Sequence, residues 1–167
     1  AQLNNFKVLY PNCTEINGKL GIEGSSIINL DGLSNIVTIK GNLEILWNSS
    51  LENLDGLNSL SIVDGYFHLQ NNEVLTNIDA LSSLNSVGNY ISISNHPSLI
   101  NLNGLNSLTT LGAYLSITNN TELNDISGIS NLDLSLIQNL NISNNSKLSV
   151  CNLPNICTYL QGTGFRT

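Results

Sequence analysis

The sequence predicts a mainly β fold, a right-handed parallel β-solenoid of about six rungs with a cap at each end. Three observations support this prediction: a repeat of about 24 residues, an alternation of apolar and polar residues in one short segment of each repeat, and an apolar residue at every third position in the remainder. They divide a single domain into an N-terminal cap (1–17), the repeats (18–148) and a truncated C-terminal cap (149–167).

The repeat is clearest when the chain is aligned on the residue before each short segment. The successive steps are 23, 24, 24, 24 and 25 residues, and the aligned positions are Gly18, Gly41, Gly65, Asn89, Ala113 and Gln138. The second and fourth residues after each of these are apolar, which is the period of a strand with one buried face. No rung could bury its apolar residues alone, so the strands are expected to stack.

Apolar residues recur at every third position after each strand. In the fourth rung they are Leu99, Leu102, Leu105, Leu108 and Leu111. This spacing is too tight for an amphipathic α-helix, whose apolar stripe alternates steps of three and four. It fits extended or 3₁₀ backbone that turns around a core, with equivalent leucines pointing inward in adjacent rungs.

One polar position lies between the strand and this apolar series. Its side chains would stack into a buried ladder, in which each amide bonds backbone groups of the turn and the next side chain. The ladder is predicted to be Asn48, Asn72, His96, Asn120 and Asn145.

These segments resemble a known pattern. Their L-x-I-x-x-N core resembles the leucine-rich repeat, and residues 12–22 (NCTEINGKLGI) resemble the start of a receptor L domain, the module of the insulin and epidermal growth factor receptors. The repeated strands with intervening L-D-G-L also resemble arrays in surface proteins of Bacteroidetes, whose C-terminal cap is similar to residues 151–160 (CNLPNICTYL). The resemblance covers roughly residues 2–160 and implies a leucine-rich repeat solenoid of the receptor L-domain type. It names no ligand, because such repeats bind many unrelated molecules.

Charge excludes two classes of partner. The net charge is −7, and the five basic residues are scattered along the chain. Phosphate binding and attachment to anionic lipid both need clustered Lys and Arg, so neither nucleic acid nor a membrane surface is an expected partner. No apolar run approaches the ~18 residues of a membrane helix, so no membrane insertion is expected.

The three cysteines lie near the two ends of the chain. Cysteines confined to the ends of a repeat array are typical of cap disulfides and favour an oxidising, extracellular location. We predict that Cys151 and Cys157 pair at two inward positions of the last rung, and that the partner of Cys13 lies outside this chain. A metal site is disfavoured, since no His lies near any of them in the sequence.

The outward strand positions form the candidate binding face. Tyr66, Tyr90 and Tyr114 occupy the same outward position in three consecutive rungs. Tyrosine combines a flat apolar face with a hydroxyl, which suits sugar rings or peptide side chains. The alternative is that these rings only stack across strands and stabilise the sheet. Flanking hydrogen bonds to a ligand would come from Glu44, His68, Gln70 and Thr118.

Nothing in the sequence indicates catalysis or a cofactor. There is no phosphate-binding glycine loop, and His68 and His96 fall in different columns, which disfavours a metal pair. Asp31 and Asp55 lie in L-D-G-L turns, where Asp commonly bonds its own backbone; a calcium site is the alternative. The predicted function is a non-catalytic extracellular recognition or adhesion module for a protein or glycan. The alternative is a structural spacer within a larger cell-surface protein.

Overall fold

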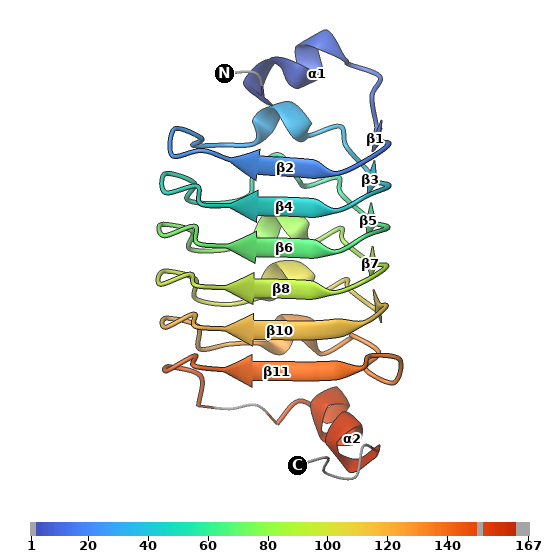
Figure 1. Ribbon diagram of the computed structural model, residues 1–167, viewed down its shortest axis with the longest axis vertical. Coiled ribbons are helices and arrows are strands. Elements are labelled where there is room, and N and C mark those ends of the chain that lie inside the picture. Colours follow the sequence, from blue (N-terminus) through green and yellow to red (C-terminus); the bar gives the residue numbers. More distant parts are fainter. Residues whose placement is uncertain (1–2, 150–151, 163–167) are drawn as a thin grey trace.

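The computed structural model describes residues 3–149 and 152–162 as a stack of parallel strands (Figure 1). A six-stranded sheet runs the length of the stack in the order β11-β10-β8-β6-β4-β2. Every pairing in it is parallel and joins equivalent positions of successive repeats, for example Ile45 to Leu69 and Leu69 to Ile93. The predicted parallel β-solenoid is confirmed. The strands are β2 (Leu20–Glu23), β4 (Leu43–Leu46), β6 (Phe67–Gln70), β8 (Ile91–Ser94), β10 (Tyr114–Thr118) and β11 (Asn139–Ser143).

A second parallel sheet lies along one edge of the solenoid, just before the main strands in each repeat (Figure 1). Its five strands have two residues each, and their order is β1-β3-β5-β7-β9. The three-residue apolar period predicted extended backbone here, but it did not predict that these segments pair into a second sheet. The strands are β1 (Glu15–Ile16), β3 (Thr38–Ile39), β5 (Ile62–Val63), β7 (Ser86–Val87) and β9 (Thr110–Leu111).

Short 3₁₀ turns form the side of the solenoid opposite the main sheet. They are η2 (Asp31–Leu33), η3 (Asp79–Leu81), η4 (Asn103–Leu105) and η5 (Ser127–Ile129). The expectation that Asp31 and Asp55 bond their own backbone is corrected by the structure. Instead, the side-chain oxygen of Asn29 accepts from the N–H of Asp31 at 3.3 Å, and that of Asn53 accepts from the N–H of Asp55 at 2.9 Å.

The core consists of the apolar residues that the period predicts to point inward. Leu57, Leu81 and Leu105 all have 0% of their surface exposed. The rungs approach one another most closely at the 3₁₀ turns: a Cβ at Gly104 would lie 1.8 Å from the carbonyl oxygen of Ile78. Glycine is therefore required at that position for the rungs to stack.

Short helices close the two ends. At the N-terminal end lie η1 (Leu3–Asn5) and α1 (Phe6–Leu9), and at the C-terminal end lies α2 (Pro154–Gly162) (Figure 1). Ile156 of α2 is only 4% exposed and belongs to the core cluster. The Asn155 amide donates to the carbonyls of Ile129 (2.8 Å) and Leu132 (3.0 Å), which ties the helix to the last 3₁₀ turn.

Cys157 does not occupy an inward position of the last rung, so that prediction is wrong. It lies on α2, where it is exposed and has no disulfide partner among the described residues. The physical reason is Pro154, which favours the first turn of a helix and starts α2 where another rung was expected. Cys151 lies outside the described residues, so its pairing with Cys157 stays a prediction. Cys13 is also free and half-buried, and it packs against the core.

We expect Leu105→Ala to lower the free energy of unfolding by about 2–5 kcal/mol, because it removes buried side-chain atoms and leaves a cavity between packed rungs. Urea unfolding followed by circular dichroism measures this change. Leu136→Ala is the matched control, since Leu136 is 70% exposed and surface substitutions usually stay within about 0.5 kcal/mol. Equal effects of the two substitutions would contradict the inward assignment of Leu105.

Candidate functional site

The outer face of the six-stranded sheet is open. Figure 1 shows the six strands on one side of the solenoid, with the 3₁₀ turns behind them and the helices at the ends. Within residues 3–149 and 152–162, no element covers the outward side chains of these strands. A partner could therefore reach the whole row of rungs from this side.

The three predicted tyrosines form one continuous stack on this face. The ring centroids of Tyr66 and Tyr90 are 4.6 Å apart with planes at 9°, and those of Tyr90 and Tyr114 are 4.5 Å apart with planes at 6°. These separations match the distance between neighbouring strands. The expected cross-strand stacking is present, and each ring is half-buried. We call these three side chains the tyrosine ridge.

Stacking changes what the ridge offers to a ligand. The flat face that would carry a sugar ring is covered by a neighbouring ring on both sides of Tyr90. The three residues are only half-buried, so with their flat faces stacked they can offer a ligand mainly ring edges and the hydroxyls of Tyr90 and Tyr114. A row of aromatic edges with hydroxyls suits contact with a protein surface better than stacking on a saccharide.

Glu44 fixes the N-terminal end of the ridge. The Tyr66 hydroxyl donates a short hydrogen bond to the Glu44 carboxylate, and Lys19 Nζ lies 2.6 Å from Glu44 Oε2. The hydrogen bond from Lys19, with that from Tyr66, lowers the pKa of Glu44. The same carboxylate raises the pKa of Tyr66. Glu44 is thus a charged support of the ridge, and its oxygens are already engaged.

Tyr90 and His68 on this face are neutral at physiological pH. Burial raises the pKa of Tyr90 to about 12, so its hydroxyl keeps its proton. Burial also lowers the pKa of His68, which pairs in register with Glu44 on the adjacent strand. The face therefore presents hydroxyl, imidazole and amide groups with little net charge.

The remaining predicted flanking residues, Gln70 and Thr118, lie at the ends of β6 and β10. Gln70 ends β6, and its register partners on the next two strands are Ser94 and then Thr118. Gln70 and Thr118 are thus two strand spacings apart, about 10 Å. Each lies four residues beyond the ridge tyrosine of its own strand, about 13 Å along it, so neither adjoins the ridge. Ser94 between them is only 8% exposed.

The predicted ladder is present directly after the strands. Four of its five members, Asn48, Asn72, His96 and Asn120, have 0% exposure. In each Asn rung the side-chain nitrogen donates to a strand carbonyl of the preceding rung, as from Asn72 to Ile45 at 3.0 Å. The side-chain oxygens of Asn72, Asn120 and Asn145 accept the N–H of the preceding ladder residue, as in the 3.0 Å bond from Asn48 to Asn72. The Asn48 oxygen, at the start of the ladder, has no hydrogen-bond partner among the described residues.

His96 reproduces both bonds with its two ring nitrogens. Nε2 lies 3.1 Å from the carbonyl oxygen of Leu69, and Nδ1 lies 3.3 Å from the backbone nitrogen of Asn72. The first contact needs a donor and the second an acceptor, so the neutral form with the proton on Nε2 makes both bonds. Nδ1 also lies 3.3 Å from the carbonyl oxygen of Asn72. Burial lowers the pKa of His96, consistent with that assignment.

The sequence analysis missed the residue just before each ladder position, which adopts a left-handed backbone. Asparagine occupies it in four rungs: Asn71, Asn95, Asn119 and Asn144, with φ of 56°, 62°, 59° and 58°. Trp47 occupies it in the remaining rung, with φ of 53°. The signal was available, because a tryptophan stands in one repeat where four others have asparagine.

A pocket of about 580 Å³ opens at this edge of the sheet, over three rungs. We call it the edge pocket; it is lined by Trp47, Ser49, Asn71, Glu73, Asn95 and Pro97. Three lining residues directly precede the ladder residues 48, 72 and 96, and the other three directly follow them. The lining residues thus flank the hydrogen-bonded ladder in each of the three rungs.

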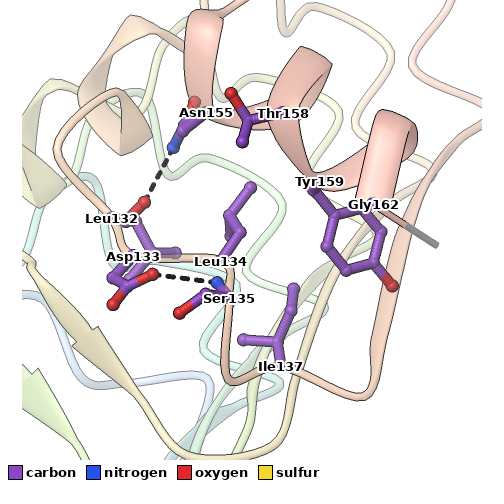
Figure 2. A pocket seen from close by; sticks show the side chains of 9 residues that line it. All are labelled: Leu132, Asp133, Leu134, Ser135, Ile137, Asn155, Thr158, Tyr159 and Gly162. Carbon is purple, nitrogen blue, oxygen red and sulfur yellow. Dashed lines mark hydrogen bonds between the residues drawn. The ribbon is translucent and has the colours of Figure 1, made fainter.

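A second pocket, of about 530 Å³, lies between α2 and the loop 132–137 (Figure 2). The core residues Leu132 and Leu134 contribute to it, and the Asn155 amide closes one end on the carbonyl of Leu132. The carboxylate of Asp133 accepts from the N–H of Ser135 at 2.9 Å, and hydrogen bonds from Ser135 lower its pKa. This pocket is the seam between the last rung and the cap helix, and its polar groups close a turn.

Residues 3–149 and 152–162 contain no group of three His, Cys, Asp or Glu side chains that could hold a metal ion. None of the helices in that part of the chain is long and apolar enough to cross a membrane.

Comparison with known proteins supports the fold. The family model described as Receptor L domain matches residues 12–75, which is less than half of the chain. The chain has a receptor L-domain-like repeat fold. Receptor L domains are non-enzymatic ligand-binding modules, so the similarity favours a binding function over catalysis. No curated protein and no solved structure matched the chain.

We expect His96→Asn to flatten the dependence of stability on pH. A histidine whose folded pKa lies below its ordinary value of 6.5 contributes stability that is present above that value. This stability is lost as the pH falls, because the unfolded chain then takes up a proton that the folded chain excludes. Urea unfolding of wild type and His96→Asn at pH 7 and pH 5 measures the difference. Asn restores the ladder residue of the other rungs, so stability at pH 7 should change little.

The control is His68→Gln, because burial also lowers the pKa of His68 but its ring is only half-buried. It should remove a smaller share of the pH dependence. The lowered pKa of Glu44 acts below its ordinary value of 4.5 and so outside this pH range. A wild-type slope in His96→Asn would contradict the neutral, buried assignment.

Proposed function

We propose that this protein is a non-catalytic extracellular recognition or adhesion module that binds a protein or glycan through the outer face of its six-stranded sheet. The similarity to Receptor L domains supports a ligand-binding role, and such domains are typically extracellular. The observation that carries the proposal is the tyrosine ridge, which stands on the open face among small polar side chains. Its exposed edges and hydroxyls favour a protein as the partner.

The ridge is held rigid before a ligand arrives. Tyr90 is stacked on both sides, and Tyr66 is tied to Glu44 and through it to Lys19. Side chains that are already fixed lose little conformational entropy on binding. Tyrosine also contributes large contact areas in interfaces at low entropic cost.

The alternative function is a structural spacer within a larger cell-surface protein. On that view the stack stabilises the sheet and no ligand contacts it. The two functions differ in what happens at Tyr90, because only a binding face loses affinity when its central ring is removed.

We expect Tyr90→Ala to weaken ligand binding by about 1–3 kcal/mol, roughly 5- to 150-fold, because it removes the central contact of the ridge. The ligand is first sought on arrays of extracellular proteins and of glycans, and affinity is then measured by calorimetry. Tyr90→Phe keeps the stack and removes only the hydroxyl, so it separates ring contact from hydrogen bonding.

Ile100→Ala serves as the control, since Ile100 is 47% exposed and lies beyond the ladder, outside the main sheet. Circular dichroism checks that Tyr90→Ala retains the solenoid after losing two ring contacts. A ligand that binds Tyr90→Ala as well as wild type would leave the ridge with a purely structural role.

A further inference from the structure

Trp47 adopts a backbone conformation that its side chain disfavours. Left-handed φ values are rare for bulky residues, whereas asparagine tolerates them because its short side chain fits there and can bond locally. The four equivalent residues with left-handed backbone are asparagines, and Trp47 has the same geometry at φ 53°. A tryptophan at this position is therefore under local strain.

Among the residues that the structure describes, no contact offsets this strain. The Trp47 side chain is 50% exposed and does not belong to the core cluster. Its N–H donates to the carbonyl of Gln70 at 3.1 Å, but Asn71 and Asn95 make the same backbone bond one rung further on. The indole ring adds no bond that asparagine would lack. Backbone strain without internal compensation is typical of binding sites.

The polar side chains around Trp47 are uncommitted. Within residues 3–149 and 152–162, no hydrogen bond or ion pair engages the side chains of Ser49, Asn71, Glu73 or Asn95. In contrast, the turn asparagines bond the backbone, as Asn53 does. Two other glutamates are held by lysines at 2.6 Å. The edge pocket thus gathers one aromatic face, two amides, one hydroxyl and one carboxylate that are free to meet a ligand.

We propose that the edge pocket binds a neutral saccharide, with one pyranose ring packed on the indole of Trp47. A pyranose has an apolar C–H face that suits an aromatic ring, and hydroxyl groups around its rim. The amides of Asn71 and Asn95 and the carboxylate of Glu73 would bond those hydroxyls, the last with a charge-assisted bond. The pocket spans two strand spacings, about 10 Å, which accommodates one or two sugar rings.

The lining excludes other ligand classes. No lysine or arginine lines the edge pocket, and Glu73 repels anions, so phosphorylated, sulfated or sialylated ligands are disfavoured. A cationic group would find one carboxylate and one aromatic face but would leave both amides unused. An apolar ligand would leave all four polar side chains unpaired.

This site is separate from the tyrosine ridge. The ridge stands at the beginning of the strands and the edge pocket at their end, five residues further along the chain, for example from Tyr66 to Asn71. Five strand residues span about 16 Å. The proposal therefore does not depend on binding at the ridge.

The test uses the full chain, in which Trp47 is the only tryptophan and so reports directly on its own site. A glycan array carrying neutral, sulfated and sialylated oligosaccharides supplies candidates, and a lysine-rich peptide serves as a cationic probe. We expect a neutral oligosaccharide to bind and to change the tryptophan fluorescence saturably. The change should persist at high salt, because binding of a neutral ligand is not screened.

Trp47→Asn should change stability and binding in opposite directions. It installs the residue that the other rungs use, so the melting temperature should rise by roughly 1–4 °C. Affinity for the saccharide, measured by calorimetry, should fall about tenfold or more because the aromatic face is lost. Trp47→Phe keeps an aromatic ring and should retain part of the affinity.

Asn95→Ala and Asn119→Ala form a matched pair. Both replace a left-handed asparagine, with φ of 62° and 59°, so both should lower the melting temperature similarly. Only Asn95 lines the edge pocket. Asn95→Ala should weaken saccharide binding, and Asn119→Ala should leave it unchanged.

Four results would each overturn the proposal. In the binding tests these are that no neutral glycan alters the Trp47 fluorescence, or that only the lysine-rich peptide binds and does so in a salt-sensitive way. In Trp47→Asn they are wild-type affinity for the saccharide or a lowered melting temperature. Tyr90→Ala is included in the same titration and should not change saccharide affinity. A saccharide that depends on Tyr90 but not on Trp47 would overturn the edge pocket and support the sheet face. If no ligand binds at the tyrosine ridge, the proposed function fails, but the test of saccharide binding at Trp47 is unaffected.

Discussion

The buried ladder is the interaction on which the rest of the structure depends. From Asn72 onward, each ladder side chain bonds a strand carbonyl and a backbone N–H of the rung before it, so it fixes both where a strand ends and how far one rung lies from the next. A rung with an extra residue between strand and ladder would leave buried polar groups unpaired, which is costly. The constant distance along the chain between strand and ladder follows from this requirement, and so do the straight columns of outward side chains.

The fold could be predicted because burial imposes a period on the sequence. Leu57, Leu81 and Leu105 repeat every 24 residues, and stacking the rungs in register buries all three. The two-residue strands of the second sheet escaped prediction, since a pair of residues such as Ile62 and Val63 is too short to show an alternation. The cap helix escaped for a different reason: the apolar residues near Cys157 fit either a rung or a helix, and tertiary packing of Ile156 decided between them.

The candidate site could be predicted only where residues at the same outward position of adjacent strands determine how their side chains lie. Tyrosines at the same outward position of adjacent parallel strands must lie about one strand spacing apart, so their stacking follows from the repeat. The link from Lys19 through Glu44 to Tyr66 crosses columns and rungs, and it depends on side-chain conformations that a period does not encode. The sequence period does not encode backbone torsion angles either. The strain at Trp47 appears only when φ is known, although the exchange of Asn for Trp was visible.

Departures from the repeat differ in whether the fold compensates them. His96 departs from asparagine, but its two nitrogens make the same two bonds, so the exchange is compensated inside the ladder. Ala80 departs from glycine at the 3₁₀ turns and lies next to Gly56, whose φ of 107° marks a differently shaped turn in the neighbouring rung. Trp47 has no such compensation, because its ring is half exposed and its backbone is strained. In a solenoid the repeat defines what stability requires. A residue that breaks the repeat without internal compensation is therefore the one whose presence stability does not explain, and the proposed saccharide site supplies a reason for Trp47.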